Sequence, residues 1–259
     1  MKLALYQIDA FTDTVFKGNP AAVCPLEKWL DDELMQSIAA ENNLSETAFY
    51  IPTIDGFHIR WFTPETEVAL CGHATLACAH ILFEILDYDK PSIHFQSQSG
   101  ILTVTRKGEL YTLNFPAQPA HESKLPSFLE AAFKTNPIKC LKSEDYLLIF
   151  NSEQEIIETS ANLEQLKKND LRGVIISAPS TDYDFVCRFF APNCGIDEDP
   201  VTGSAYTQLV PYWSKELVKN SLTAKQVSPR GGEVWLEQQQ DRVLISGKAV
   251  LYMRGEIKI

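Results

Sequence analysis

Two short segments of the chain carry residue types that suit a proton-transfer site. Glu46 begins a stretch with the composition of an apolar strand, and Cys71 and His73 flank Gly72 where a loop leads into a second apolar run. Burial at a strand start would raise the pKa of the Glu46 carboxyl group toward the operating pH, as a general base requires. A thiol at a helix start can have a lowered pKa, which makes Cys71 a second candidate base. The alternative for Glu46 is an ordinary solvated carboxylate in a loop.

A third segment, Asp199 to Ser204, offers a carboxylate, two hydroxyls and a glycine before another apolar run. The first N–H groups of a helix lack partners and carry the positive end of its dipole, so a helix start can hold a carboxylate and stabilise developing negative charge. We therefore expect anion-binding helix starts at Gly72 and Gly203, facing one cleft. Asp199 has two interpretations that can coexist: a helix N-cap with Pro200 at the first helical position, or a carboxylate that orients a substrate amine or hydroxyl.

The sequence context of His73 suggests a role in a site, whereas the contexts of His80 and Asn19 suggest structural roles. His73 is the histidine that we expect to be exposed to a cleft, because it lies where a loop becomes a helix. His80 falls within the apolar run and is expected to be a core residue. Asn19, between Gly18 and Pro20, is by its spacing typical of a turn.

The segments that must position these residues repeat along the chain at an offset of 128 residues. The matched positions are Phe57 with Phe185, Arg60 with Arg188, Phe62 with Phe190, and Pro64 with Pro192. At the same offset Cys71 falls on Asp199 and Glu46 on Val174, so we expect the base in only one half. The repeat predicts two similar α+β lobes related by a pseudo-twofold axis.

Hydrophobic periodicity predicts the elements of each half. The run from Ala74 to Leu86 is apolar on nearly every side, so this helix must be surrounded by protein, as a curled sheet would provide. We therefore expect two lobes, residues 1–117 and 118–247, each a mostly antiparallel, barrel-like sheet around a central buried helix. Strands are expected over 3–11, 48–51, 57–62, 101–115 as a hairpin, 174–177, 185–190, 234–236, 243–245 and 249–253, and further helices over 30–41, 161–168 and 205–213.

Composition and missing motifs exclude several other classes. The chain has 23 basic and 34 acidic side chains, a net charge of −11, which disfavours nucleic acid and anionic membranes as partners. The six cysteines form no CxxC, and no Walker A, GxGxxG, HExxH or GxSxG sequence occurs. No secretory signal is recognisable, so a cytoplasmic protein with reduced thiols is expected.

Four motifs together resemble the PhzF family of phenazine-biosynthesis-like isomerases. They are FKGNPAAV at 16–23, SETAF at 45–49, CGHATLA at 71–77 and DPVTGSA at 199–205, in the family's order and spacing. The resemblance implies a diaminopimelate-epimerase-like fold in which the C-terminal strand, about 248–259, returns to the first lobe. It also implies a substrate site between the lobes, no cofactor, no metal and frequent homodimers.

The resemblance assigns roles to individual residues. Glu46 matches the acid/base glutamate of the family, and His73 and Asp199 match groups that act beside it on the substrate. The remaining matches are substrate-binding positions: Asn19, Ser45, Gly72, Gly203 and Ser204. Val201 departs from the alanine that is usual there, and the second cysteine of the related epimerases is missing.

These observations lead to three hypotheses. The first is a cofactor-independent isomerase that moves a proton on a small carboxylate-bearing metabolite, with Glu46 as the acid/base. The second is an amino-acid epimerase or racemase in which Cys71 is one base. The third is a non-catalytic binding protein that retains the fold.

Overall fold

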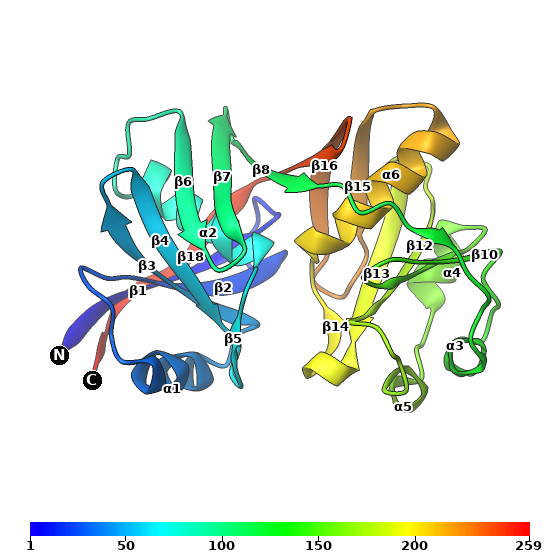
Figure 1. Ribbon diagram of the computed structural model, residues 1–259, viewed down its shortest axis with the longest axis horizontal. Helices are drawn as coiled ribbons and strands as arrows, with labels where there is room; N and C mark the ends of the chain where they lie inside the picture. Colours follow the sequence, from blue (N-terminus) through cyan, green and yellow to red (C-terminus); the bar gives the residue numbers. More distant parts are fainter. The chain divides into compact units, whose positions relative to one another are not determined.

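The chain folds into two compact units. The computed structural model describes residues 1–259. Unit 1 comprises residues 1–114 and 246–259, and unit 2 comprises residues 115–245 (Figure 1). Both contain more strand than helix, which confirms the α+β class.

Unit 1 is a sheet packed against a buried helix. Its elements are β1 (Lys2–Ala10), β2 (Asn19–Pro25), α1 (Asp32–Asn42), β3 (Glu46–Thr53), β4 (Gly56–Phe62), β5 (Glu67–Val68), α2 (Gly72–Glu84), β6 (Ser92–Ser97), β7 (Gly100–Lys107), most of β8 (Leu110–Pro116) and β18 (Ala249–Lys258). β18 pairs antiparallel with β1, which brings both ends of the chain side by side (Figure 1).

Helix α2 is enclosed, as its composition predicts. Ten of its 13 residues are buried, and it packs against β1, β2, β3 and β18. Because the strands cover its apolar surface, residues 73–75 of its first turn are buried inside the unit. This enclosure decides the environment of the side chains that precede and begin the helix.

Unit 2 combines a second sheet with several short helices. Its elements are β9 (His121–Glu122), α3 (Ser127–Ala132), β10 (Lys139–Lys142), β11 (Tyr146–Ile149), α4 (Glu153–Glu158), α5 (Leu163–Leu166), β12 (Val174–Pro179), β13 (Phe185–Ala191), the 3-10 turns η1 (Pro192–Cys194) and η2 (Gly203–Ala205), β14 (Ile196–Asp199), α6 (Tyr206–Leu217), β15 (Ser221–Gln226), β16 (Gly232–Gln239) and most of β17 (Arg242–Gly247). The helix predicted over 161–168 is only the four residues of α5.

The internal repeat is visible in how the strands pair. In unit 1, β3 pairs in parallel with β2 and antiparallel with β4, and β4 pairs in parallel with β6. In unit 2, β12 pairs in parallel with β11 and antiparallel with β13, and β13 pairs in parallel with β15. The repeated strands therefore occupy the same places in the two pairing patterns.

A repeated ion pair secures the loop before each central helix. Arg60 of β4 binds both carboxylate oxygens of Glu67, each at 2.7 Å, and lies over the Phe62 ring. Arg188 of β13 binds both oxygens of Glu198, at 2.6 and 2.9 Å, and lies over the Phe190 ring. Bidentate pairs of this kind fix geometry as well as charge, so each pair anchors the strand that leads into a candidate segment.

No helix of the protein is both long enough and apolar enough to cross a membrane.

Candidate active site

Glu46 is the first residue of β3, at the point where the chain leaves α1. The helix ends at Asn43, whose φ of 49° turns the backbone out of the helical path. Strand β3 then runs in parallel with β2, with Glu46 opposite Ala21. The side chain of Glu46 is only 12% exposed, so the carboxyl group is largely removed from solvent, which agrees with the buried interpretation and not with the alternative of a solvated loop carboxylate.

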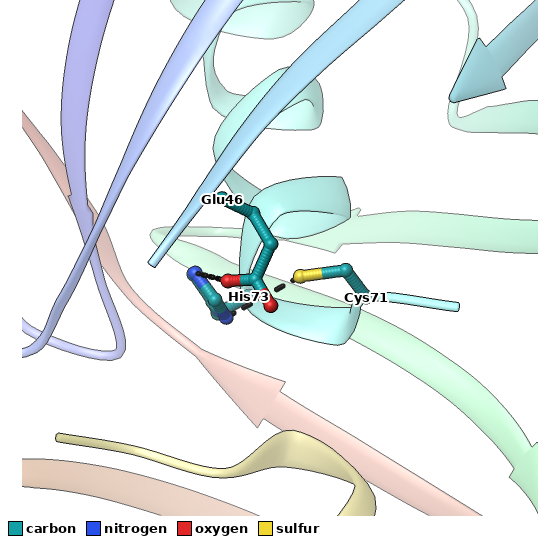
Figure 2. Close-up of side chains that lie close together, drawn as sticks. All are labelled: Glu46, Cys71 and His73. Carbon is teal, nitrogen blue, oxygen red and sulfur yellow. Dashed lines mark hydrogen bonds and ion pairs between the residues drawn. The ribbon is translucent and has the colours of Figure 1, made fainter. Parts of the chain in front are cut away.

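His73 contacts both Glu46 and Cys71 (Figure 2). Its Nε2 is 3.2 Å from Oε2 of Glu46, and its Nδ1 is 3.4 Å from Sγ of Cys71. Cys71 is the extended N-cap residue of α2, and its carbonyl oxygen accepts hydrogen bonds from N–H and Oγ1 of Thr75. The first turn of α2 and the start of β3 therefore bring a thiol, an imidazole and a carboxylate together. In the sequence Cys71 and Glu46 are separate candidates, and we did not predict that they would be neighbours.

The expected exposure of His73 is wrong. The residue is 5% exposed, because the strands that enclose α2 also cover its first turn. Burial lowers the pKa of His73 to about 3, since the charged ring would lose its hydration. The ring is therefore neutral near pH 7 and carries a single N–H.

Asn19 and Ser45 lie at the starts of the neighbouring strands β2 and β3. Ser45 Oγ donates a hydrogen bond of 3.3 Å to Oδ1 of Asn19, which is fully buried. The preceding Gly18 has a φ of +64°, and a Cβ atom there would lie 2.1 Å from the carbonyl oxygen of Ala10. Asn19 is therefore a fixed strand residue that follows a tight turn, and it is in contact with a second predicted site residue.

The N-cap interpretation of Asp199 is wrong. Asp199 ends β14, the 3-10 turn η2 begins at Gly203, and α6 begins only at Tyr206. The Asp199 carbonyl oxygen accepts from Nε2 of Gln226 at 2.7 Å instead of accepting a helical N–H. This tertiary hydrogen bond outweighs the local Asp-Pro start signal. The Asp199 carboxylate accepts from Oγ1 of Thr202 at 2.5 Å.

Two residues that position the unit 2 segment were missed in the sequence. Gln226, fully buried at the end of β15, also accepts from N–H of Thr202 at 2.9 Å. Arg172 donates to Oγ of Ser204 at 2.9 Å and is itself held by the fully buried carboxylate of Asp145. Neither has a local motif, because each acts on residues more than 20 positions away.

The predicted residues thus fall into two groups. Asn19 contacts Ser45, and Glu46 contacts His73, which directly follows Gly72; all are in unit 1. Asp199, Gly203 and Ser204 are in unit 2, where Asp199 and Ser204 have different hydrogen-bond partners. Only the first group brings several ionisable side chains into direct contact.

Comparison with known proteins gives the family. The sequence profile of PhzC-PhzF, described as phenazine biosynthesis-like protein, matches residues 8–255. The chain belongs to the PhzC-PhzF family. An uncharacterized isomerase of Pseudomonas aeruginosa is 49% identical, with all of both chains covered, and one of Halalkalibacterium halodurans is 47% identical over 99% of each chain. The predicted resemblance is confirmed.

Solved structures give the same result for the PhzC-PhzF fold. A PhzF-family phenazine biosynthesis protein of Enterococcus faecalis matches with a TM-score of 0.98 and 45% identity over all of both chains. A hydroxyproline epimerase of Agrobacterium vitis matches with a TM-score of 0.64 and 11% identity, over 99% of this chain and 92% of that one. The second match shows a common fold only.

The Glu46, Cys71 and His73 side chains also form a group that could bind a metal ion. Their oxygen, sulfur and nitrogen donors lie within 4.8 Å of one another, and this donor set suits zinc. However, His73 directs Nδ1 to Cys71 and Nε2 to Glu46. One ion bound by all three would require the ring or its neighbours to move, because His73 makes a hydrogen bond to Cys71 through one nitrogen and an ion-pair contact with Glu46 through the other.

Proposed function

We propose that this PhzC-PhzF protein is a cofactor-independent isomerase that moves a proton on a small carboxylate-bearing metabolite. The observation that carries the proposal is the Glu46 carboxylate, largely buried and 3.2 Å from the neutral His73 ring at the start of α2. The relatives from Pseudomonas aeruginosa and Halalkalibacterium halodurans are named as uncharacterized isomerases. Their substrates do not follow from those names.

In this mechanism Glu46 removes a proton from a carbon that is acidified by conjugation and returns it to another carbon of the same molecule. The amides at Gly72 would hold the substrate carboxylate and stabilise the enolate-like charge. A positioned acid/base group contributes about 10²–10⁴-fold to such a rate. Asn19 and Ser45, and in unit 2 Asp199, Gly203 and Ser204, are proposed substrate contacts.

The proposal is tested by following deuterium from D₂O into carboxylates that bind the protein. Calorimetry against a panel of small unsaturated and cyclic carboxylates identifies a binder, and NMR then detects exchange and product. Glu46→Gln keeps the shape of the side chain and should lower the exchange rate about 10²–10⁴-fold with an unchanged fold. Glu41→Gln, at an exposed position of α1, is the matched control.

Normal turnover in Glu46→Gln would contradict the role of Glu46. A binder that is neither exchanged nor converted by the native protein would favour the non-catalytic hypothesis.

An amino-acid epimerase remains the second candidate, because Cys71 and Glu46 both contact the His73 ring. In that case exchange of the substrate α-hydrogen would be abolished by Cys71→Ser and retained by Glu46→Gln. Unit 2 has Asp199 at the position that corresponds to Cys71 in the repeat. A pair of equivalent thiol bases is therefore not available, which favours the glutamate mechanism.

We also propose that the protein is a homodimer, as the family resemblance implies. Light scattering coupled to size-exclusion chromatography tests this directly. A mass near 29.1 kDa would correspond to a monomer and contradict it.

A further inference from the structure

The two ring nitrogens of His73 face chemically different partners. Nδ1 faces the Cys71 thiol at 3.4 Å, and Nε2 faces Oε2 of Glu46 at 3.2 Å. The ring is 5% exposed, so solvent contributes little to satisfying either nitrogen. A neutral imidazole has one N–H donor and one acceptor nitrogen, and the partners decide which is which.

Only one assignment satisfies both contacts while Glu46 is ionised. If the proton were on Nδ1, the lone pair of Nε2 would face the carboxylate, and two acceptors would lie 3.2 Å apart. If the proton is on Nε2, it lies on the side of the Glu46 carboxylate, which attracts it across 3.2 Å without the geometry of a hydrogen bond, and Nδ1 accepts a hydrogen bond from S–H of Cys71. The second arrangement removes the repulsion between the two acceptors, and it needs a neutral thiol at Cys71.

The backbone holds Cys71 in the position that this hydrogen bond requires. Thr75, fully buried in the first turn of α2, donates from both its N–H and its Oγ1 to the Cys71 carbonyl oxygen, at 3.2 and 2.6 Å. These two bonds fix the N-cap residue relative to the helix on which His73 lies. The distance from Sγ to Nδ1 is therefore set by the helix start.

We propose that Cys71 is a positioning residue, which donates its S–H to Nδ1 of His73 and so keeps the single ring proton on Nε2, the nitrogen that faces Oε2 of Glu46. This inference rests on the proposed function, in which Glu46 is the base. It differs from the epimerase hypothesis, in which the Cys71 sulfur itself takes the proton.

The first test needs no substrate. The full-length protein is labelled with ¹⁵N-histidine, and the His73 signals are assigned among the five histidines with a His73→Gln variant. We expect a neutral ring near pH 7, with the proton on Nε2 and a hydrogen-bonded Nδ1. In Cys71→Ala the Nδ1 signal should move toward that of an unbonded ring nitrogen, whereas Cys71→Ser, whose O–H also donates, should retain the bonded signal. Cys78→Ala, which removes another buried thiol of α2, is the control and should leave the signal unchanged.

The second test uses the exchange assay above. Loss of one hydrogen bond to the ring should lower kcat about threefold to tenfold in Cys71→Ala, with KM nearly unchanged, and Cys71→Ser should restore it. Four results would each overturn the inference. Two concern the ring itself: a proton on Nδ1, or a doubly protonated ring. The other two are an Nδ1 signal that is unchanged in Cys71→Ala, and a Cys71→Ser variant as impaired as Cys71→Ala. Turnover retained by Glu46→Gln would instead contradict the proposed function, and the tautomer of the free protein is measured independently of that result.

Discussion

The two units share a pattern of strand pairing but differ where that pattern could carry chemistry. Unit 1 has Glu46 at the start of β3, whereas unit 2 has the fully buried Val174 at the start of β12. Before the central helix, Cys71 and His73 of unit 1 correspond to Asp199 and Val201 of unit 2.

The buried polar groups of the two units have correspondingly different roles. In unit 1, Cys71 and Glu46 both contact the His73 ring, so three ionisable side chains lie together. In unit 2 the amide of Gln226 closes a network with the backbone of residues 199–202. A duplicated scaffold can therefore keep its fold while one copy brings ionisable side chains together and the other anchors a loop.

The largest expected effect comes from placing the acid of unit 1 in unit 2. Val174→Glu would put a carboxylate into the hydrophobic core cluster that includes Tyr146 and Phe190, where it would lose its hydration. We expect unfolding in urea at pH 7 to show a loss of about 3–5 kcal/mol. Val174→Gln should lose less, and the deficit of Val174→Glu should shrink at acidic pH. Equal losses in both variants at all pH values would show that charge is not the cause.

Removing the amide of Gln226 should have the next largest effect. Gln226→Ala leaves the Thr202 N–H and the Asp199 carbonyl oxygen without their buried partner, at a cost of about 2–3 kcal/mol in the free energy of unfolding. Ser97 ends the equivalent strand β6 of unit 1 and bonds within its own hairpin, so Ser97→Ala should cost under about 0.5 kcal/mol. If Gln226→Ala is as stable as Ser97→Ala, the interpretation that Gln226 anchors the loop of residues 199–202 is contradicted.

The pH dependence of stability should distinguish His73 from its apolar counterpart. Its pKa is about 3 in the folded protein and about 6.5 when unfolded, so between these values the unfolded chain binds more protons. The stabilisation is present above pH 6.5 and is lost as the pH falls through this window, by about 2 kcal/mol at pH 5. Urea unfolding at several pH values should show a smaller loss for His73→Asn. An identical pH dependence in His73→Asn would contradict this assignment.

The smallest difference is expected between the two arginine pairs. Arg188 also donates to the carbonyl oxygens of Ile156 and Thr159, whereas Arg60 has the exposed Asp32 as its additional partner. Arg188→Ala should therefore lower the free energy of unfolding by about 1 kcal/mol more than Arg60→Ala does. Thermal unfolding of both variants tests the ranking, and a larger loss in Arg60→Ala would reverse our interpretation of the anchors.

Much of the fold could be predicted because it depends on local pattern. The composition of residues 74–86 requires a helix enclosed by protein, and the structure has α2 there with strands packed against it. The repeat at an offset of 128 residues corresponds to the shared pairing of β3 with β4 and of β12 with β13. The short motifs of residues 16–23, 45–49, 71–77 and 199–205 were sufficient to indicate the family.

What the sequence by itself determined about this protein is the set of candidate groups, the enclosed helix and the family, because residue type and spacing act over a few positions. Only the tertiary structure decided that His73 is buried in contact with Cys71 and Glu46, and that Gln226 replaces the helical partner of the Asp199 carbonyl oxygen. Those outcomes depend on which strands cover a helix start and on contacts between residues 27 positions apart. Burial and long-range pairing of this kind have no local trace, since they arise only when distant segments pack together.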